Sequence, residues 1–153
     1  LIPKTSSQNR RYIPMGIVTP DELCSDLVFL IPNGTIYHFG VLESNVHMAW
    51  MRVVAGRLKS DYRYSKDIVY NNFPWPTPTD AQKAKIEKTA QGILDARAKY
   101  PDSSLVLMPP ELRKAHQAND RAVMEAYGFW GKLNTESECV AQLMKMYQKL
   151  VDK

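Results

Sequence analysis

Cysteine is scarce in this chain. Its two cysteines, Cys24 and Cys139, lie far apart, and neither belongs to a C-x-x-C motif. One pair is not a disulfide framework, so we expect a reduced intracellular protein. The three histidines, His38, His47 and His116, have no second ligand at the spacing of a metal site. We therefore expect ordinary structural histidines and no bound metal.

Glycine is also sparse, at 7 residues in 153. None are arranged as G-x-G-x-x-G or G-x-x-x-x-G-K-[ST], the loops that cradle phosphates, and no G-x-S-x-G nucleophile motif is present. Cys24 has acidic neighbours, which disfavour a reactive thiolate. The sequence therefore lacks the signals of a nucleotide-binding or nucleophilic enzyme, and this chain alone is not expected to catalyse a reaction.

Long apolar runs are missing as well. No run approaches the roughly 18 residues that a membrane span requires, and the first residues do not resemble a secretory signal. The chain begins LIPKTSSQNRRYIP, without an initiator methionine. We expect no membrane partner, and we interpret the sequence as part of a longer protein.

The charge is moderately basic and evenly divided. The net charge is +4, with 8 Lys and Arg against 6 Asp and Glu before Pro76, and 12 against 10 after it. The densest positive stretch runs from Arg52 to Lys66, with five basic residues and one acid. Any site for an anionic partner must therefore come from local clustering, and this stretch is the candidate.

The first half predicts a small mixed, strand-rich subdomain. The runs RRYIPMGIV and DLVFLIP are aromatic and β-branched, and Asn33-Gly34 predicts a hairpin between the second run and TIYHFGVL. A helix should follow, capped by Ser44 or Asn45 and ending near Gly56. Its apolar residues recur at helical spacing: Val46, Trp50, Val53, Val54 and Leu58.

The second half predicts three amphipathic helices, and the whole chain is therefore an α+β protein ending in a three-helix bundle. The Pro-rich stretch 74–78 marks the boundary. The first helix should begin at a capping box, Thr79 with Gln82, and end at Pro101. The second should run from Pro109-Pro110 to Gly128, and the third should begin at a capping box from Thr135 to Glu138. Their apolar stripes are Ile86, Ala90, Ile93 and Leu94; Leu112, Ala115, Ala122, Val123 and Ala126; and Val140, Leu143, Met144, Tyr147, Leu150 and Val151.

The stretch GRLKSDYRYS is the best candidate for a binding site. If residues 58–65 form one strand, Lys59, Asp61 and Arg63 lie on one face, and Leu58, Tyr62 and Tyr64 on the other. The polar face then presents cation, anion and cation over about 13 Å. Such a row suits base edges in the DNA major groove, because Asp accepts from cytosine N4, and Lys or Arg donates to guanine.

A purely structural explanation fits the same pattern. Lys59, Asp61 and Arg63 can equally form ion pairs along an exposed edge strand, which contribute little to stability. Arg52, Arg57 and nearby Lys66 suit phosphate contacts, which position DNA without specifying a sequence. They also suit a solvated surface, so spacing alone leaves both interpretations open.

Several segments carry a resemblance to a known family. RRYIPMGIV, HFGVLESNVHMAWMRVVAGRLKSDYRYS and IVYNNFPWP closely resemble the target-recognition region of MmeI-like (type IIG or IIL) restriction–modification enzymes. These bacterial proteins join a nuclease, an S-adenosylmethionine-dependent adenine-N6 methyltransferase and a DNA-recognition domain. The tail MPPELRKAHQANDRAVMEAYGF is similar to their C-terminal helical domain. The likeness covers nearly the whole chain and is most specific from His38 to Pro76.

The resemblance implies a function and its residues. Residues 1–76 would be the C-terminal part of a target-recognition domain and residues 77–153 the helical domain. Lys59, Asp61 and Arg63 would read bases, and Arg57 would lie beside the DNA backbone, where Arg52 and Lys66 are the further candidates. The partners would be double-stranded DNA and an upstream methyltransferase domain of the same polypeptide, in the bacterial cytoplasm. S-adenosylmethionine, and Mg²⁺ if the parent also cleaves, would be bound outside this chain.

The sequence departs from the family pattern in two places. No Gly-rich S-adenosylmethionine loop and no N-P-P-[YFW] motif are present; in NFPW, residues 72–75, Phe73 occupies the Pro position. We interpret Phe73 and Trp75 as residues that fill a hydrophobic seam. The connection around Leu105–Met108 is shorter than in the family.

One alternative function belongs to another class. The helical tail could dock a catalytic domain or a second subunit, with no direct contact between this chain and DNA. Exposed Met144, Tyr147 and Leu150 would support that function.

Overall fold

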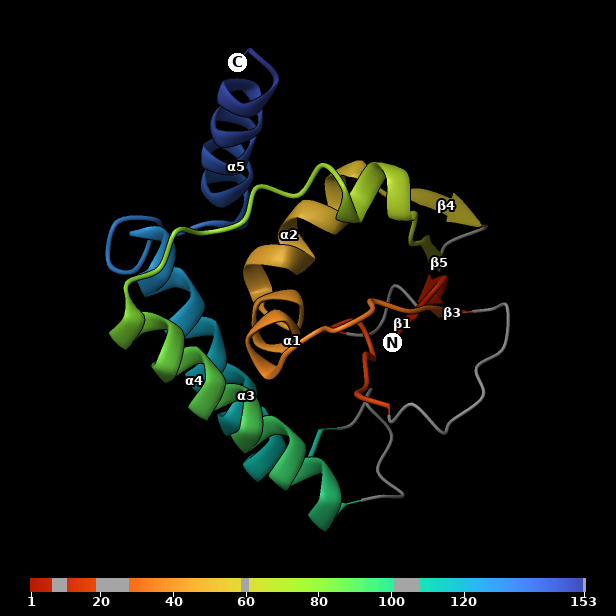
Figure 1. Cartoon of the computed structure of the whole chain (residues 1–153), viewed down its shortest axis with the longest axis vertical. Helices are drawn as coiled ribbons and strands as arrows, with labels where there is room; N and C mark the ends of the chain where they lie inside the picture. Colours follow the sequence, from red (N-terminus) through yellow and green to blue (C-terminus); the bar gives the residue numbers. More distant parts are fainter. Residues whose placement is uncertain (7–10, 19–27, 59–60, 101–107, 153) are drawn as a thin grey trace.

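The computed structural model describes residues 1–6, 11–18, 28–58, 61–100 and 108–152 (Figure 1). The elements are β1 (Ile2–Pro3), β2 (Thr5–Ser6), β3 (Val28–Phe29), α1 (Ile36–Leu42), α2 (Asn45–Val54), β4 (Gly56–Leu58), β5 (Asp61–Arg63), the π-helix η1 (Lys66–Tyr70), α3 (Asp80–Lys99), α4 (Pro110–Tyr127) and α5 (Glu136–Val151). The predicted α+β class is confirmed, although the strands are only two or three residues long. The connection expected around Leu105–Met108 lies, apart from Met108, outside the described residues.

The hairpin predicted at Asn33-Gly34 is wrong. The turn itself is real, because Asn33 has a φ of 58° and the Gly34 N–H donates to the Ile31 carbonyl over 3.3 Å. It leads into helix α1 instead of a strand. The Thr35 hydroxyl accepts from the His38 N–H, and His38 Nδ1 accepts from the Thr35 N–H over 3.1 Å, which forms a capping box. Burial of α1 then overrides its strand-like composition.

The single strand predicted over residues 58–65 is also wrong. Strands β4 and β5 are antiparallel, with Gly56 opposite Arg63, Arg57 opposite Tyr62, and Leu58 opposite Asp61. Strand β2 pairs with the other edge of β5, so the sheet order is β2-β5-β4. A second, two-stranded sheet joins β1 to β3.

Beyond β5 the chain forms the π-helix η1 instead of further strand. The Ser65 hydroxyl accepts from the Ile68 N–H and caps this helix. The Trp50 indole N–H donates to the Val69 carbonyl over 3.0 Å and holds η1 on α2. The Ser65 cap and the hydrogen bond from Trp50 to Val69 therefore favour a helix over further extended strand after β5.

Helix α2 begins where the sequence predicts. Ser44 is its N-cap, and its hydroxyl accepts from the His47 N–H over 3.3 Å. The helix is buried over much of its circumference, beyond the predicted stripe, at Val46, His47, Met48, Ala49, Trp50 and Met51. Of the predicted apolar residues, Val53 is exposed and Leu58 lies in β4, after the helix has ended.

The three predicted C-terminal helices are present, and their starts follow the predicted caps. Thr79 and Gln82 form the capping box of α3, and Thr135 caps α5 by accepting from the Glu138 N–H. The Glu138 carboxylate accepts from the Asn134 N–H instead of completing the box. Gly128 ends α4 in the left-handed conformation, with a φ of 77°.

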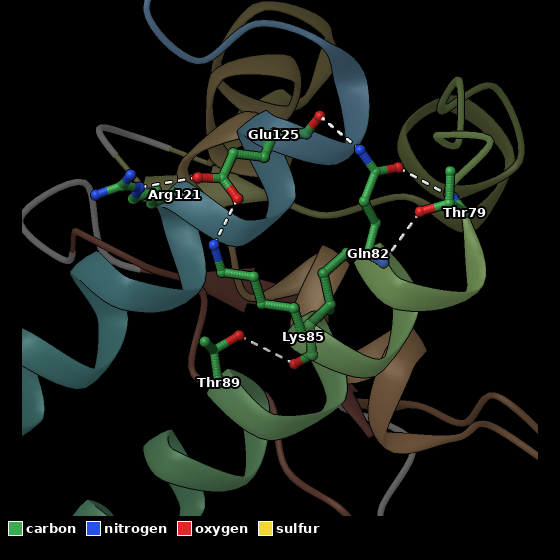
Figure 2. Close-up of polar contacts among 7 residues, drawn as sticks. Thr79, Gln82, Lys85, Thr89, Arg121 and Glu125 are labelled. Carbon is green, nitrogen blue, oxygen red and sulfur yellow. Dashed lines mark hydrogen bonds and ion pairs between the residues drawn. The ribbon is translucent and has the colours of Figure 1, made fainter.

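Helices α3 and α4 pack side by side, and polar contacts supplement this packing (Figure 2). The Glu125 carboxylate accepts from Lys85 over 2.6 Å and from Arg121 over 2.9 Å, while its carbonyl accepts from the Gln82 amide. Helix α5 packs against α2 instead, and projects from the body of the molecule (Figure 1). No described helix has the length and apolar character needed to cross a membrane.

The two halves of the chain share one core. Helix α1 packs on α3, and Gly40 allows the close approach: a Cβ placed there would meet the Ile86 side chain at 2.7 Å and Ala90 at 3.1 Å. Gly92, in the middle of α3, has open space around the same position. These two helical glycines therefore form a matched pair for a stability test.

We expect Gly40→Ala to lower the free energy of unfolding by about 1–3 kcal/mol, because the added methyl overpacks the α1–α3 contact. Gly92→Ala should raise it by about 0.5–1 kcal/mol, because alanine is the better helix former. Urea unfolding of the two variants and the parent chain measures both effects. A neutral Gly40→Ala would contradict the close approach.

Candidate nucleic-acid interface

The structure brings the backbone of three predicted site residues into one hairpin. Arg57 lies in β4, and Asp61 and Arg63 lie in β5. Arg63 is exposed, and so is Lys66 at the start of η1. Lys59 is outside the described residues. The predicted division of the strand is confirmed where side chains are described, because Tyr62 and Tyr64 are only 6% and 3% exposed.

The buried side of β5 rests on α2. The Tyr64 hydroxyl and His47 Nε2 are joined by a hydrogen bond of 2.9 Å. His47 is fully buried, and burial lowers its pKa to about 3, so the imidazole is neutral. Burial also raises the pKa of Tyr64, which keeps the phenol protonated. The contact is therefore a hydrogen bond between two neutral groups.

Phe73 is also buried and packs against His47. It meets the His47 ring edge to face, with centroids 4.4 Å apart, and also contacts Trp50 and Tyr127. The interpretation of NFPW as a hydrophobic seam is confirmed. The Asn72 amide donates to the carbonyls of Asp67 and Ile68 over 3.1 and 3.2 Å, so this side chain is occupied at the end of η1.

Strand β2 is a neighbour of β5 that the sequence did not reveal. Thr5 lies opposite Arg63, Ser6 lies opposite Tyr62, and the Tyr64 N–H donates to the Lys4 carbonyl over 2.7 Å. This pairing joins segments almost sixty residues apart, and no local motif encodes it. The N-terminal segment therefore borders the strand that carries Asp61 and Arg63.

Arg52 lies in a different setting from Arg63. Its guanidinium forms an ion pair with Glu136, the first residue of α5, and its side chain is 33% exposed. The pair borders a cleft of about 460 Å³ between α2 and the α4–α5 loop, which is also lined by Arg11 and Trp130. A phosphate at Arg52 would have to compete with the Glu136 carboxylate.

Buried polar contacts fix α2 to the C-terminal helices. Asp120 in α4 accepts from the Tyr12 hydroxyl over 2.5 Å and from the Asn45 N–H over 2.9 Å. Burial raises the pKa of Asp120 to about 6. Arg97 in α3 donates to Glu43 over 2.6 Å, just before α2 begins. The β4–β5 hairpin and the helical tail are thus connected through one helix.

The described part of the chain contains no group of three or more His, Cys, Asp and Glu side chains that could hold a metal ion. His47 and His116 are buried, and Cys139 is a buried free thiol whose pKa burial raises to about 11. Cys24 lies outside the described residues.

Comparisons with known proteins agree with one another. The family model "MmeI, target recognition domain" matches residues 1–77, and the model "MmeI, C-terminal domain" matches residues 78–153. The chain is 39% identical to DNA methyltransferase A of Bacillus subtilis (strain 168), covering 100% of the chain and 18% of that protein. It is 46% identical to a solved structure of the Type IIL restriction-modification enzyme MmeI in complex with DNA. That match has a TM-score of 0.93 and covers 99% of this chain and 21% of the other. The chain thus spans about a fifth of these relatives.

Buried neutral histidines make stability sensitive to acid. The pKa of His47 and of His116 is about 3 in the folded state, against about 6.5 when unfolded. Between these values the unfolded chain binds more protons, so the free energy of unfolding falls as the pH drops from about 6.5 toward 3. Each such histidine adds at most about 1.4 kcal/mol per pH unit.

We therefore expect His47→Gln to show a shallower loss of stability between pH 7 and pH 4 than the parent chain. Urea unfolding at several pH values measures the slope. Tyr64→Phe is the matched control, because it removes the same hydrogen bond and leaves the imidazole buried; its slope should stay steep. An unchanged slope in His47→Gln would refute the neutral, buried imidazole.

Proposed function

This chain belongs to the MmeI family, with that family's target recognition domain and C-terminal domain, and on this premise we propose that it is the DNA-specificity segment of a DNA methyltransferase. The observation that carries the proposal is the β4–β5 hairpin within the target-recognition match. Its exposed Arg63 follows Asp61 in a strand anchored by buried Tyr62 and Tyr64. A rigid strand with a polar outer face is what base reading in a major groove requires.

The proposed base-reading residues are Lys59, Asp61 and Arg63. Asp61 would accept from cytosine N4, and Lys59 would donate to the guanine of the same base pair. Arg63 would donate to a neighbouring guanine or to a phosphate. The presence of the acidic Asp61 among Lys and Arg side chains supports this assignment. A surface that contacts only phosphates would not need a carboxylate at that position.

The proposed backbone contacts are Arg57, Lys66 and Arg52. Such contacts supply most of the affinity and make it depend on salt. Lys66 is exposed at the start of η1, which suits this role. Arg52 would have to exchange the Glu136 carboxylate for a phosphate oxygen, so we expect it to contribute least.

The remaining parts of the activity are assigned to the rest of the parent protein. An upstream methyltransferase domain would bind S-adenosylmethionine, flip an adenine out of the duplex and methylate its N6. Residues 1–76 of this chain would hold the DNA, and residues 77–153 would support them. The parent would act on double-stranded DNA in the bacterial cytoplasm.

A second role is favoured by one observation. Leu150 and Val151, at the end of α5, are each 57% exposed, whereas Met144 and Tyr147 are half-buried. The end of α5 would then dock the catalytic domain. A gel shift at low and moderate salt separates the two roles, because a pure docking module shows no salt-dependent DNA binding.

Exchanging the charges of the base-reading pair should change the recognised base pair. In the full-length parent, Lys59→Glu with Asp61→Arg should convert a C·G requirement into G·C, because the donor and acceptor trade places. Sequencing of methylated sites in DNA treated with the double variant tests this. A recognition motif identical to that of the parent would exclude base reading by these residues.

Arg57→Ala should weaken the parent's binding to cognate and random duplexes by similar factors, because phosphate contacts carry no sequence information. The slope of log affinity against log salt should also fall by about 1. Fluorescence anisotropy titrations at several salt concentrations measure both quantities. A loss confined to the cognate duplex would show that Arg57 reads bases.

A further inference from the structure

The exposed and buried residues of β5 depend on one register. Arg63 is exposed while Tyr62 and Tyr64 on either side are buried. Because side chains alternate along a strand, a slip by one residue would bury Arg63 and expose the tyrosines. The strand itself is short, with three residue pairs to β4 and two to β2. So short a ladder needs an additional contact to fix its register.

The contact beside Arg63 is the hydrogen bond of Tyr64. Its hydroxyl meets His47 Nε2 at 2.9 Å, and both side chains are almost completely buried. His47 lies in α2, which the Asn45 N–H ties to Asp120 and the Trp50 indole ties to Val69. Phe73 packs edge-on against the imidazole at 4.4 Å and restricts its rotation. The imidazole is therefore a fixed partner for the Tyr64 hydroxyl.

We propose that His47 is a positioning residue that fixes the register of β5. The register in turn determines that the Arg63 side chain lies on the outer face, where it would contact DNA. The inference rests on the proposed function, since it concerns the strand that reads bases. His47 acts through Tyr64 and does not touch DNA. The helical tail contributes to this positioning, because Asp120 in α4 holds α2 in place through the Asn45 N–H.

Within the described part of the chain, the Tyr64 hydroxyl is the only hydrogen-bond partner of the His47 ring nitrogens. His47 Nδ1 is buried and has no hydrogen-bond partner within the described residues. Removing the Tyr64 hydroxyl would leave both ring nitrogens unpaired in an apolar setting, which is unfavourable. Tyr64 and His47 would then lose the interaction that distinguishes the native register from a shifted one.

The test uses the full-length parent with Tyr64→Phe and His47→Phe. Initial methylation rates are measured on the cognate duplex and on duplexes with one changed base pair, together with the melting temperature. We expect the ratio of cognate to changed-site rates to fall about tenfold in both variants, comparable to one lost base contact. Tyr64→Phe keeps the ring, so it remains informative if His47→Phe fails to fold.

The matched control is Tyr127→Phe. It removes a hydroxyl that donates to the Pro74 carbonyl over 2.7 Å, a comparable loss away from the hairpin. Its melting temperature should fall by a similar amount while the rate ratio is unchanged. If Tyr64→Phe behaves like Tyr127→Phe, with lower stability and an unchanged ratio, His47 has only a structural role and the inference is overturned.

A reference variant separates this failure from a failure of the proposed function. Arg63→Ala should lower the rate ratio directly. If Arg63→Ala lowers it and Tyr64→Phe does not, only the positioning role is lost. If neither variant changes the ratio, Arg63 does not read a base and the inference falls with it, whereas base reading by Lys59 and Asp61 is tested separately by the charge exchange.

Discussion

The burial of helix α2 is the constraint on which the rest of the structure depends. Strand β5 reaches it through Tyr64 and His47, and η1 reaches it through Trp50 and Val69. Helices α4 and α5 contact it from the C-terminal half. A helix buried over so much of its circumference cannot rotate or slide without breaking several of these contacts at once. The strand that carries exposed Arg63 is therefore held rigidly against the core.

The parts of the fold that the sequence predicts are those with local signals. The starts of α3 and α5 were predictable because Thr79 and Thr135 cap the helices with their own side chains. The hairpin predicted at Asn33-Gly34 was wrong because a turn with positive φ can lead into either a strand or a helix. The capping box of Thr35 with His38 decided the outcome, and histidine at that position is not a usual signal.

The alternation of exposed and buried side chains at the candidate site could be predicted from the sequence. The segments that pack beside the site could not. Tyr64 and Arg63 lie on opposite sides of the strand because of the two-residue period alone. The pairing of β2 with β5, and the ion pair of Arg52 with Glu136, join residues that are distant in the sequence. Only the folded chain brings them together, so neither periodicity nor motif spacing could reveal them.

The one-in, one-out alternation of β5 has a consequence for how this molecule can evolve. Arg63 is exposed, whereas the neighbouring tyrosines carry the packing. A replacement at such a surface position usually changes stability by less than about 0.5 kcal/mol. Substitutions of the exposed residue can therefore introduce a different side-chain chemistry at little cost in stability. Substitutions of the buried tyrosines would disturb the packing of the core. Adjacent residues in one strand thus differ in how strongly the stability of the core constrains them.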